Sequence, residues 1–135
     1  MACEGWVLDV VDLGGRRVGR FWVRGGVVGR LRGLLGTGDD ADPIALLGCG
    51  SIHTHGMRYS IDVAFVSGDG RVLLAARGVL PGNVVSCPGA RTVLERPSRD
   101  GWWPVVGDVV ELRLLRGSRV GGSAPLACPE SCGRE

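Results

Sequence analysis

The chain has 135 residues, which is enough for one domain with a core that needs no disulfide bridges. Its 44% of hydrophobic and 22% of charged residues are typical of globular proteins and exclude a disordered or fibrous chain. The net charge of +2 is small and the 16 basic residues, all of them arginine, are dispersed, so we expect no nucleic-acid partner.

The sequence also lacks the features of membrane and secreted proteins. No apolar run approaches the ~18 residues of a membrane span. Acidic residues interrupt the N-terminal segment, which is therefore unlike a secretory signal. The five cysteines are an odd set without regular spacing, as in proteins of a reducing compartment. We predict a cytoplasmic protein that is a monomer or a weak homodimer.

The first part of the chain predicts a hairpin, a helix and a strand. Runs rich in valine and aromatic residues at 6–11 and 18–23, with a Gly-Gly pair between them, are typical of a β-hairpin. The apolar residues of 26–35 recur at helical spacing and predict one short helix. The apolar run at 44–47 is short enough to indicate a strand.

The second part predicts further strands. Both faces of 61–66 are largely apolar, so we expect a central strand, and the Ser-Gly-Asp-Gly turn after it predicts a hairpin with 71–76. Residues 91–96 and 109–115 are further strand candidates. Together these elements predict a mainly β fold, a compact small barrel or sandwich of six to eight short strands with one short helix.

The composition changes near the C-terminus. Residues 1–116 form the predicted single β-rich domain, whereas 117–135 are rich in Gly, Ser, Pro and Cys and are predicted to be disordered. Cys128 and Cys132 in this tail supply two ligands, whereas a structural zinc site normally needs four. We therefore assign no site to the tail.

The stretch SIHTHGMRYSIDVAFV, residues 51–66, crowds polar and ionisable groups in front of the predicted central strand. His53 and His55 are two positions apart, so on an extended segment their side chains point to the same face. We predict a non-catalytic binding or accessory module that recognises a small polar ligand or a protein partner through the 49–62 region. The candidate ligand-binding residues are Ser51, His53, Thr54, His55, Met57, Arg58 and Asp62.

Asp62 requires a partner, because it lies in an apolar strand and an unpaired buried carboxylate costs several kcal/mol. Arg58 is the nearest cation in the sequence, which predicts a bidentate ion pair that pins the bend between them. The alternative is that both groups line a pocket and meet an anionic or hydroxyl-rich ligand.

A metal- or thiol-dependent enzyme is the alternative function. Cys49, His53, His55 and Cys87 are the candidate metal ligands, and a set of cysteine and histidine suits zinc. Cys49 and His53 are also a candidate thiolate–imidazole pair for nucleophilic catalysis. In the binding-module interpretation we expect no cofactor.

Several of these motifs together resemble the domain of unknown function 192 family over roughly residues 15–116. The similar segments are SIHTHGMRYSIDVAFVSGDGRVL, the upstream Arg-Gly-Leu-Leu-Gly of 32–36, and the downstream Gly-Ala, Val-Leu-Glu and Val-Gly-Asp-Val segments. The resemblance implies a small, mostly β, single domain and no defined activity. The chain departs from the family pattern at His55, where Phe is usual, and at Ser60, where Pro is usual.

Overall fold

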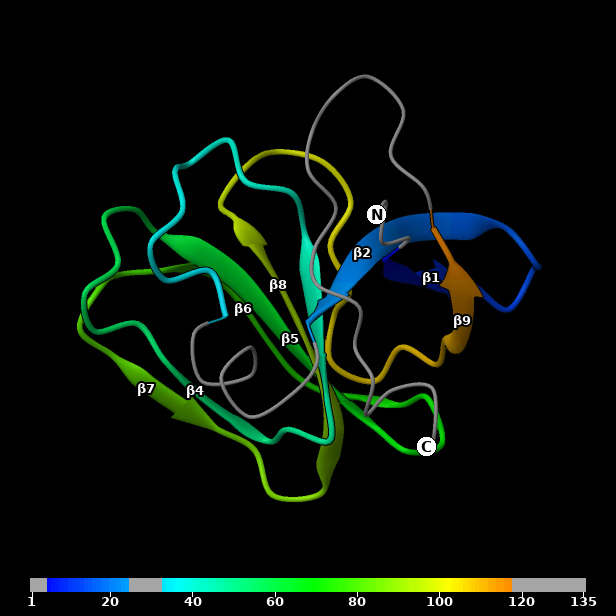
Figure 1. The fold of residues 1–135 in the computed structure, drawn as a ribbon. Helices are drawn as coiled ribbons and strands as arrows, with labels where there is room; N and C mark the ends of the chain where they lie inside the picture. The colour runs from blue at the N-terminus through cyan, green and yellow to red at the C-terminus, as the bar shows by residue number, and fades with distance from the viewer. Residues whose placement is uncertain (1–4, 25–32, 118–135) are drawn as a thin grey trace.

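The computed structural model describes residues 5–24 and 33–117, and within these ranges it contains nine strands and no helix. The mainly β prediction is therefore confirmed, with one strand more than the predicted six to eight. Figure 1 shows their arrangement. The strands are β1 (Trp6–Val11), β2 (Arg17–Arg24), β3 (Ile44–Leu47), β4 (Ser51–His53), β5 (Ile61–Ser67), β6 (Val72–Val79), β7 (Val84–Ser86), β8 (Ala90–Pro97) and β9 (Glu111–Arg116).

Seven strands form one mixed sheet in the order β6-β5-β8-β3-β2-β1-β9, and β4 pairs with β7 in a separate two-stranded sheet. Strands β2 and β3 are parallel, and the other pairs are antiparallel. The predicted hairpins β1–β2 and β5–β6 are confirmed. Of the predicted barrel or sandwich, the barrel is not found among the described strands, because the large sheet is open and β6 and β9 are its edge strands. One isolated bridge, between Arg71 and Val109, links the segments just before these two strands.

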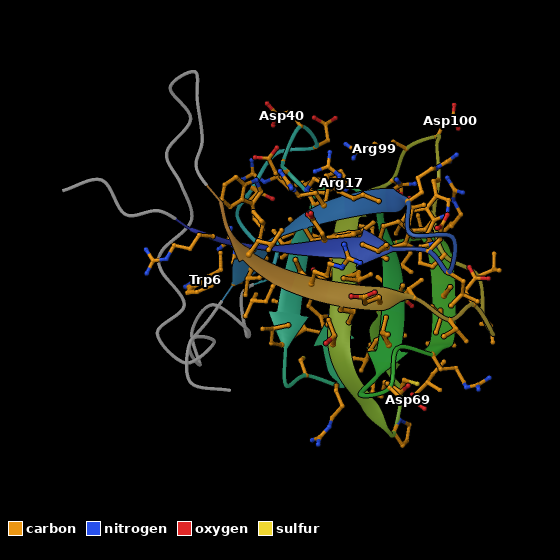
Figure 2. The ribbon with its side chains drawn as sticks, turned by 90° about the vertical axis from the view of Figure 1, so that its right-hand side faces the viewer. Trp6, Arg17, Asp40, Asp69, Arg99 and Asp100 are labelled. Atoms are coloured by element: carbon orange, nitrogen blue, oxygen red, sulfur yellow. The ribbon has the colours of Figure 1, made fainter. Side chains whose placement is uncertain are left out.

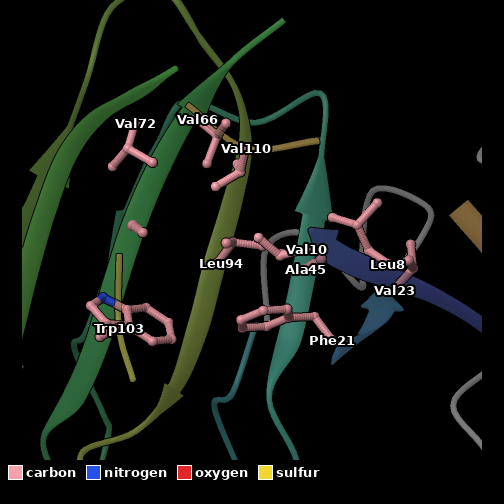
Figure 3. Close-up of a cluster of buried hydrophobic side chains, with 11 residues drawn as sticks. Leu8, Val10, Phe21, Val23, Ala45, Val66, Val72, Leu94, Trp103 and Val110 are labelled. Atoms are coloured by element: carbon pink, nitrogen blue, oxygen red, sulfur yellow. The ribbon is translucent and has the colours of Figure 1, made fainter. Parts of the chain in front are cut away.

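The large sheet curls back over itself. In Figure 2, β1, β2 and β9 cross in front of β5, β6 and β8. A hydrophobic cluster lies between the two ends, and Figure 3 shows Phe21, Leu94 and Trp103 within it. The ring centroids of Phe21 and Trp103 are 5.9 Å apart in an edge-to-face arrangement, and the indole Nε1 donates to the carbonyl of Val63 at 3.2 Å. This cluster, cluster 1, is the core of the curled sheet.

A second cluster covers the opposite face of the same strands. Along β5, Ala64 and Val66 belong to cluster 1, whereas Val63 and Phe65 belong to this second cluster, cluster 2. The predicted central strand is thus buried on both faces, which its continuous apolar sequence indicated. Ile52 of β4 is part of cluster 2, so the small sheet covers this face. Figure 1 places β4 and β7 on the opposite side of β5 and β8 from β1 and β9.

The predicted helix over 26–35 is not found in the described part of the chain. Residues 26–32 of that prediction lie outside the described residues, and 33–36 form a turn. Gly33 and Gly36 have φ values of +50° and +84°, which an α-helix does not contain. Residues 118–135 of the predicted tail, with Cys128 and Cys132, also lie outside the described residues. Among the described residues, no helix is long and apolar enough to cross a membrane.

Candidate functional site

A cavity of about 490 Å³ lies between β4 and the cluster 2 side of β5 and β8. Its volume is within the range of about 300–1,000 Å³ that small-molecule sites occupy. We call it the Glu95 cavity, after the acidic residue in its wall. Its lining residues are Gly33, Leu34, Ser51, Ile52, His53, His55, Met57, Ile61, Val84 and Glu95. Five of these residues have apolar side chains and four have polar ones, and the polar groups determine what the cavity can recognise.

The two histidines lie together at the rim of the Glu95 cavity. Their rings are stacked, with centroids 5.6 Å apart and planes inclined by 30°, and both side chains are exposed. The same-face placement of His53 and His55 that their spacing indicated is therefore present. Ser51 and Met57, two more of the candidate residues, line the same cavity, and the Ser51 hydroxyl lies 2.8 Å from that of Ser86.

Glu95 is the residue that sequence reasoning missed. It lies on β8 opposite Val63, on the face that carries Val93 into cluster 2, and its side chain is only 3% exposed. Burial raises the pKa of Glu95 to about 7, against a hydrogen bond from the Leu34 amide and the charge of Arg24, which both act to lower it. The alternation that pairs Glu95 with Val93 was visible in the sequence, but not the depth of its burial.

Gly33 allows the carboxyl group to approach the backbone closely. A β-carbon built on this glycine would lie 3.0 Å from the Glu95 Oε1 atom, closer than ordinary van der Waals contact. The positive φ of Gly33 also disfavours any L side chain there. The wall of the cavity beside Glu95 is therefore backbone rather than side chain.

Asp62 is paired, but the predicted partner Arg58 is not the cation that binds it. The Asp62 carboxylate accepts hydrogen bonds from Arg96 Nε at 2.9 Å, from the Ser98 hydroxyl at 3.0 Å and from the Gly78 amide at 3.0 Å. Arg96 faces Asp62 directly in the β5–β8 pairing. Burial acts to raise the pKa of Asp62, but these hydrogen bonds outweigh it and hold the pKa below its ordinary value. The need for a partner was correctly predicted; its identity was wrong because the partner comes from another strand.

Thr54 and Arg58 do not line the Glu95 cavity. Thr54 is fully buried, and its hydroxyl donates to the Leu80 carbonyl at 2.7 Å and accepts from the Asn83 amide at 2.8 Å. It therefore fixes the turn before β7. The Arg58 side chain is exposed and lies beside the loop that follows Gly36. Asp62, which faces cluster 1 rather than cluster 2, does not line the cavity either.

The two cysteines of the predicted metal site are half-buried at the edge of cluster 2, and neither lines the Glu95 cavity. The Cys49 thiol donates to the Ser51 carbonyl at 3.2 Å, and the Cys87 thiol lies 3.9 Å from the Pro88 carbonyl. Within residues 5–24 and 33–117, no three His, Cys, Asp or Glu side chains are grouped so that they could hold a metal ion. The zinc site and the thiol nucleophile stay predictions from the sequence.

Comparison with known proteins identifies the fold alone. No protein-family model matches the chain, and no curated protein sequence matches it. A solved structure of a protein of unknown function from Novosphingobium aromaticivorans is similar with a TM-score of 0.57 at 20% identity, covering 78% of this chain and 83% of that one. A putative transcription regulator from Sinorhizobium meliloti is similar with a TM-score of 0.60 at 15% identity, covering 83% of this chain and 96% of that one. At these identities the chain is shown to share their β fold, and no more.

Proposed function

We propose that the protein is a non-catalytic binding module that recognises a small polar ligand in the Glu95 cavity. The observation that carries this proposal is the Glu95 carboxyl group, 3% exposed, in the wall of a cavity that is otherwise largely apolar. Small-molecule sites combine apolar walls, which supply most of the buried area, with a few polar groups that fix the ligand's orientation. Glu95 supplies such a group in the wall, and Ser51, His53 and His55 supply others at the rim.

The proposal retains three expectations from the sequence. These are membership of the domain of unknown function 192 family, a cytoplasmic location, and a protein partner as the other kind of ligand for the 49–62 region. The fold shared with the two solved structures supports a small β domain, which is what the family resemblance implies.

Blocking the cavity tests this function. Val84 lines the cavity and is 64% exposed, so Val84→Trp should narrow the entrance without disturbing the core. Leu80 is similarly exposed at 65% but does not line the cavity, so Leu80→Trp is the matched control. The probes are small amines, alcohols, amides and carboxylates, added to isotope-labelled protein while amide NMR signals are followed.

We expect at least one probe class to shift the signals of Ser51, His53 and Glu95 in the wild type and in Leu80→Trp, but not in Val84→Trp. The proposal fails if no probe shifts these signals, or if Val84→Trp binds as tightly as the wild type. It also fails if the responding signals belong to residues outside the cavity.

A metal- or thiol-dependent enzyme is the second candidate, and the stacked imidazoles of His53 and His55 are the observation in its favour. Elemental analysis of the purified wild type, His53→Ala and His55→Ala separates it from the binding module. One metal ion per chain in the wild type, lost in both variants, would support the metalloenzyme. A wild type without bound metal would exclude the metal-dependent enzyme.

A further inference from the structure

We infer that the Glu95 cavity takes a ligand with one ammonium group on a short apolar stem, and that the ammonium group pairs with the Glu95 carboxylate. This inference rests on the proposed binding function and specifies the chemistry of the ligand.

Within the described residues, the charge of Glu95 is incompletely compensated. A buried carboxylate is stable only when donors or cations replace the water that it loses. The Leu34 amide donates one hydrogen bond, and Arg24 contributes charge, yet the effect of burial still exceeds both. A ligand cation in the cavity would supply the missing compensation, whereas an anion would add repulsion.

The contrast with Asp62 shows that the protein can compensate a buried carboxylate when it contains the partner. Asp62 has Arg96 at 2.9 Å together with two further donors, and it lies away from the cavity. Glu95, on the neighbouring strand, instead borders empty volume. A ligand cation therefore has room to pair with the Glu95 carboxylate, whereas Asp62 already has its partner.

The rest of the cavity fits the other parts of such a ligand. The walls contributed by Leu34, Ile52 and Ile61 are apolar and buried, and they suit an aliphatic stem. An ammonium group has three donors, of which the carboxylate uses one or two. His53 and His55 line the same cavity, and a neutral imidazole carries one acceptor nitrogen that can add a hydrogen bond to a polar ligand.

Three probes of equal stem length test the inference: butylammonium, 1-butanol and butyrate, titrated into the protein while the amide signals of cavity residues are followed by NMR. At about pH 8, where Glu95 is ionised, butylammonium should bind at least about tenfold more tightly than either of the others. Glu95→Gln should remove this preference. Glu111→Gln removes an equal charge from the exposed strand β9 and should retain it.

The pH dependence supplies a second measurement. Lowering the pH to about 5.5 should weaken butylammonium binding, because Glu95 then takes up a proton. In the part of the chain that the structure describes, the other ionisable groups around the carboxyl group are His53, His55, Arg24 and Tyr59, and all four remain in Glu95→Gln. The part of the pH dependence that disappears in that variant is therefore due to Glu95.

The outcomes separate this inference from the binding function on which it rests. If 1-butanol or butyrate binds in the cavity as tightly as butylammonium, the ammonium inference is wrong and the binding function stands. The same holds if Glu95→Gln leaves the preference for butylammonium unchanged. If none of the three probes and no other small molecule binds there, both proposals are wrong.

Discussion

Replacing Glu95 with glutamine should change how the stability of the protein depends on pH. The carboxyl group is 3% exposed, and burial raises its pKa from 4.5 to about 7. As the pH rises above 4.5, the unfolded chain releases this proton while the folded protein retains it until about pH 7. The unfolded state is thereby favoured, so Glu95 lowers the free energy of unfolding progressively between these two values. Glutamine carries no titrating proton and removes this loss.

The magnitude follows from the two pKa values. The difference between 4.5 and about 7 corresponds to about 3 kcal/mol, which the wild type loses in full above pH 7 and retains in full below pH 4.5. The free energy of unfolding of Glu95→Gln minus that of the wild type should therefore rise by about 3 kcal/mol from pH 4.5 to pH 8. Contributions of all other titrating groups are common to both chains and cancel in this difference.

Urea unfolding monitored by tryptophan fluorescence, under reducing conditions and at pH steps across this window, measures the difference. Glu111→Gln is the control, because Glu111 is exposed and pairs with Arg113 on the surface. Its difference from the wild type should stay nearly constant over the same range. A constant difference for Glu95→Gln as well would refute the argument that Glu95 is an incompletely compensated buried acid.

Two further predictions concern the fold around the site. Asp62→Ala leaves the Arg96 guanidinium buried without its carboxylate and should lower the free energy of unfolding by about 3–5 kcal/mol, whereas Arg58→Ala, at an exposed position, should change it by less than about 0.5 kcal/mol. Equal losses in urea unfolding would contradict this assignment of the partner. Gly70→Ala should cost more than Gly82→Ala, for which about 1–2 kcal/mol is expected, because both glycines have φ of +88° but a β-carbon at Gly70 would also overlap a backbone carbonyl of the segment before β9. Equal thermal stability of the two variants would show that the backbone around Val110 moves to accommodate the added β-carbon without cost.

The pKa values of two buried acids on neighbouring strands are thus shifted in opposite directions. Asp62 faces cluster 1, and its hydrogen bonds from Arg96, Ser98 and Gly78 hold its pKa below the ordinary value. Glu95 faces cluster 2 and a cavity, and burial raises its pKa to about 7. Acidic groups whose pKa values are shifted in opposite directions have different roles, since a fully paired carboxylate stabilises the fold and an incompletely compensated one beside a cavity is available to a ligand.

Local patterns in the sequence were enough to predict much of the scaffold. The apolar run of 61–66, followed by a glycine-rich turn, predicted the β5–β6 hairpin, and the absence of a polar face predicted that β5 is central. The His-x-His spacing predicted that His53 and His55 face the same way. These features depend on residues that are close in sequence, because strand alternation and tight turns are properties of the local backbone.

The tertiary structure decided the features that depend on pairing between distant segments. The β5–β8 pairing brings Arg96 opposite Asp62 across 34 positions of sequence, so a search for a nearby cation chose Arg58 instead. The same pairing places Glu95 opposite Val63 on the cluster 2 face, where it lies against Gly33 and the Leu34 amide, which no local pattern specifies. The sequence alone predicted seven of the nine described strands, all but β4 and β7, and that Asp62 needs a partner. Only packing of the two faces of the sheet decided which carboxylate is paired and which one borders the cavity, because burial depends on everything that covers a residue and not on its neighbours along the chain.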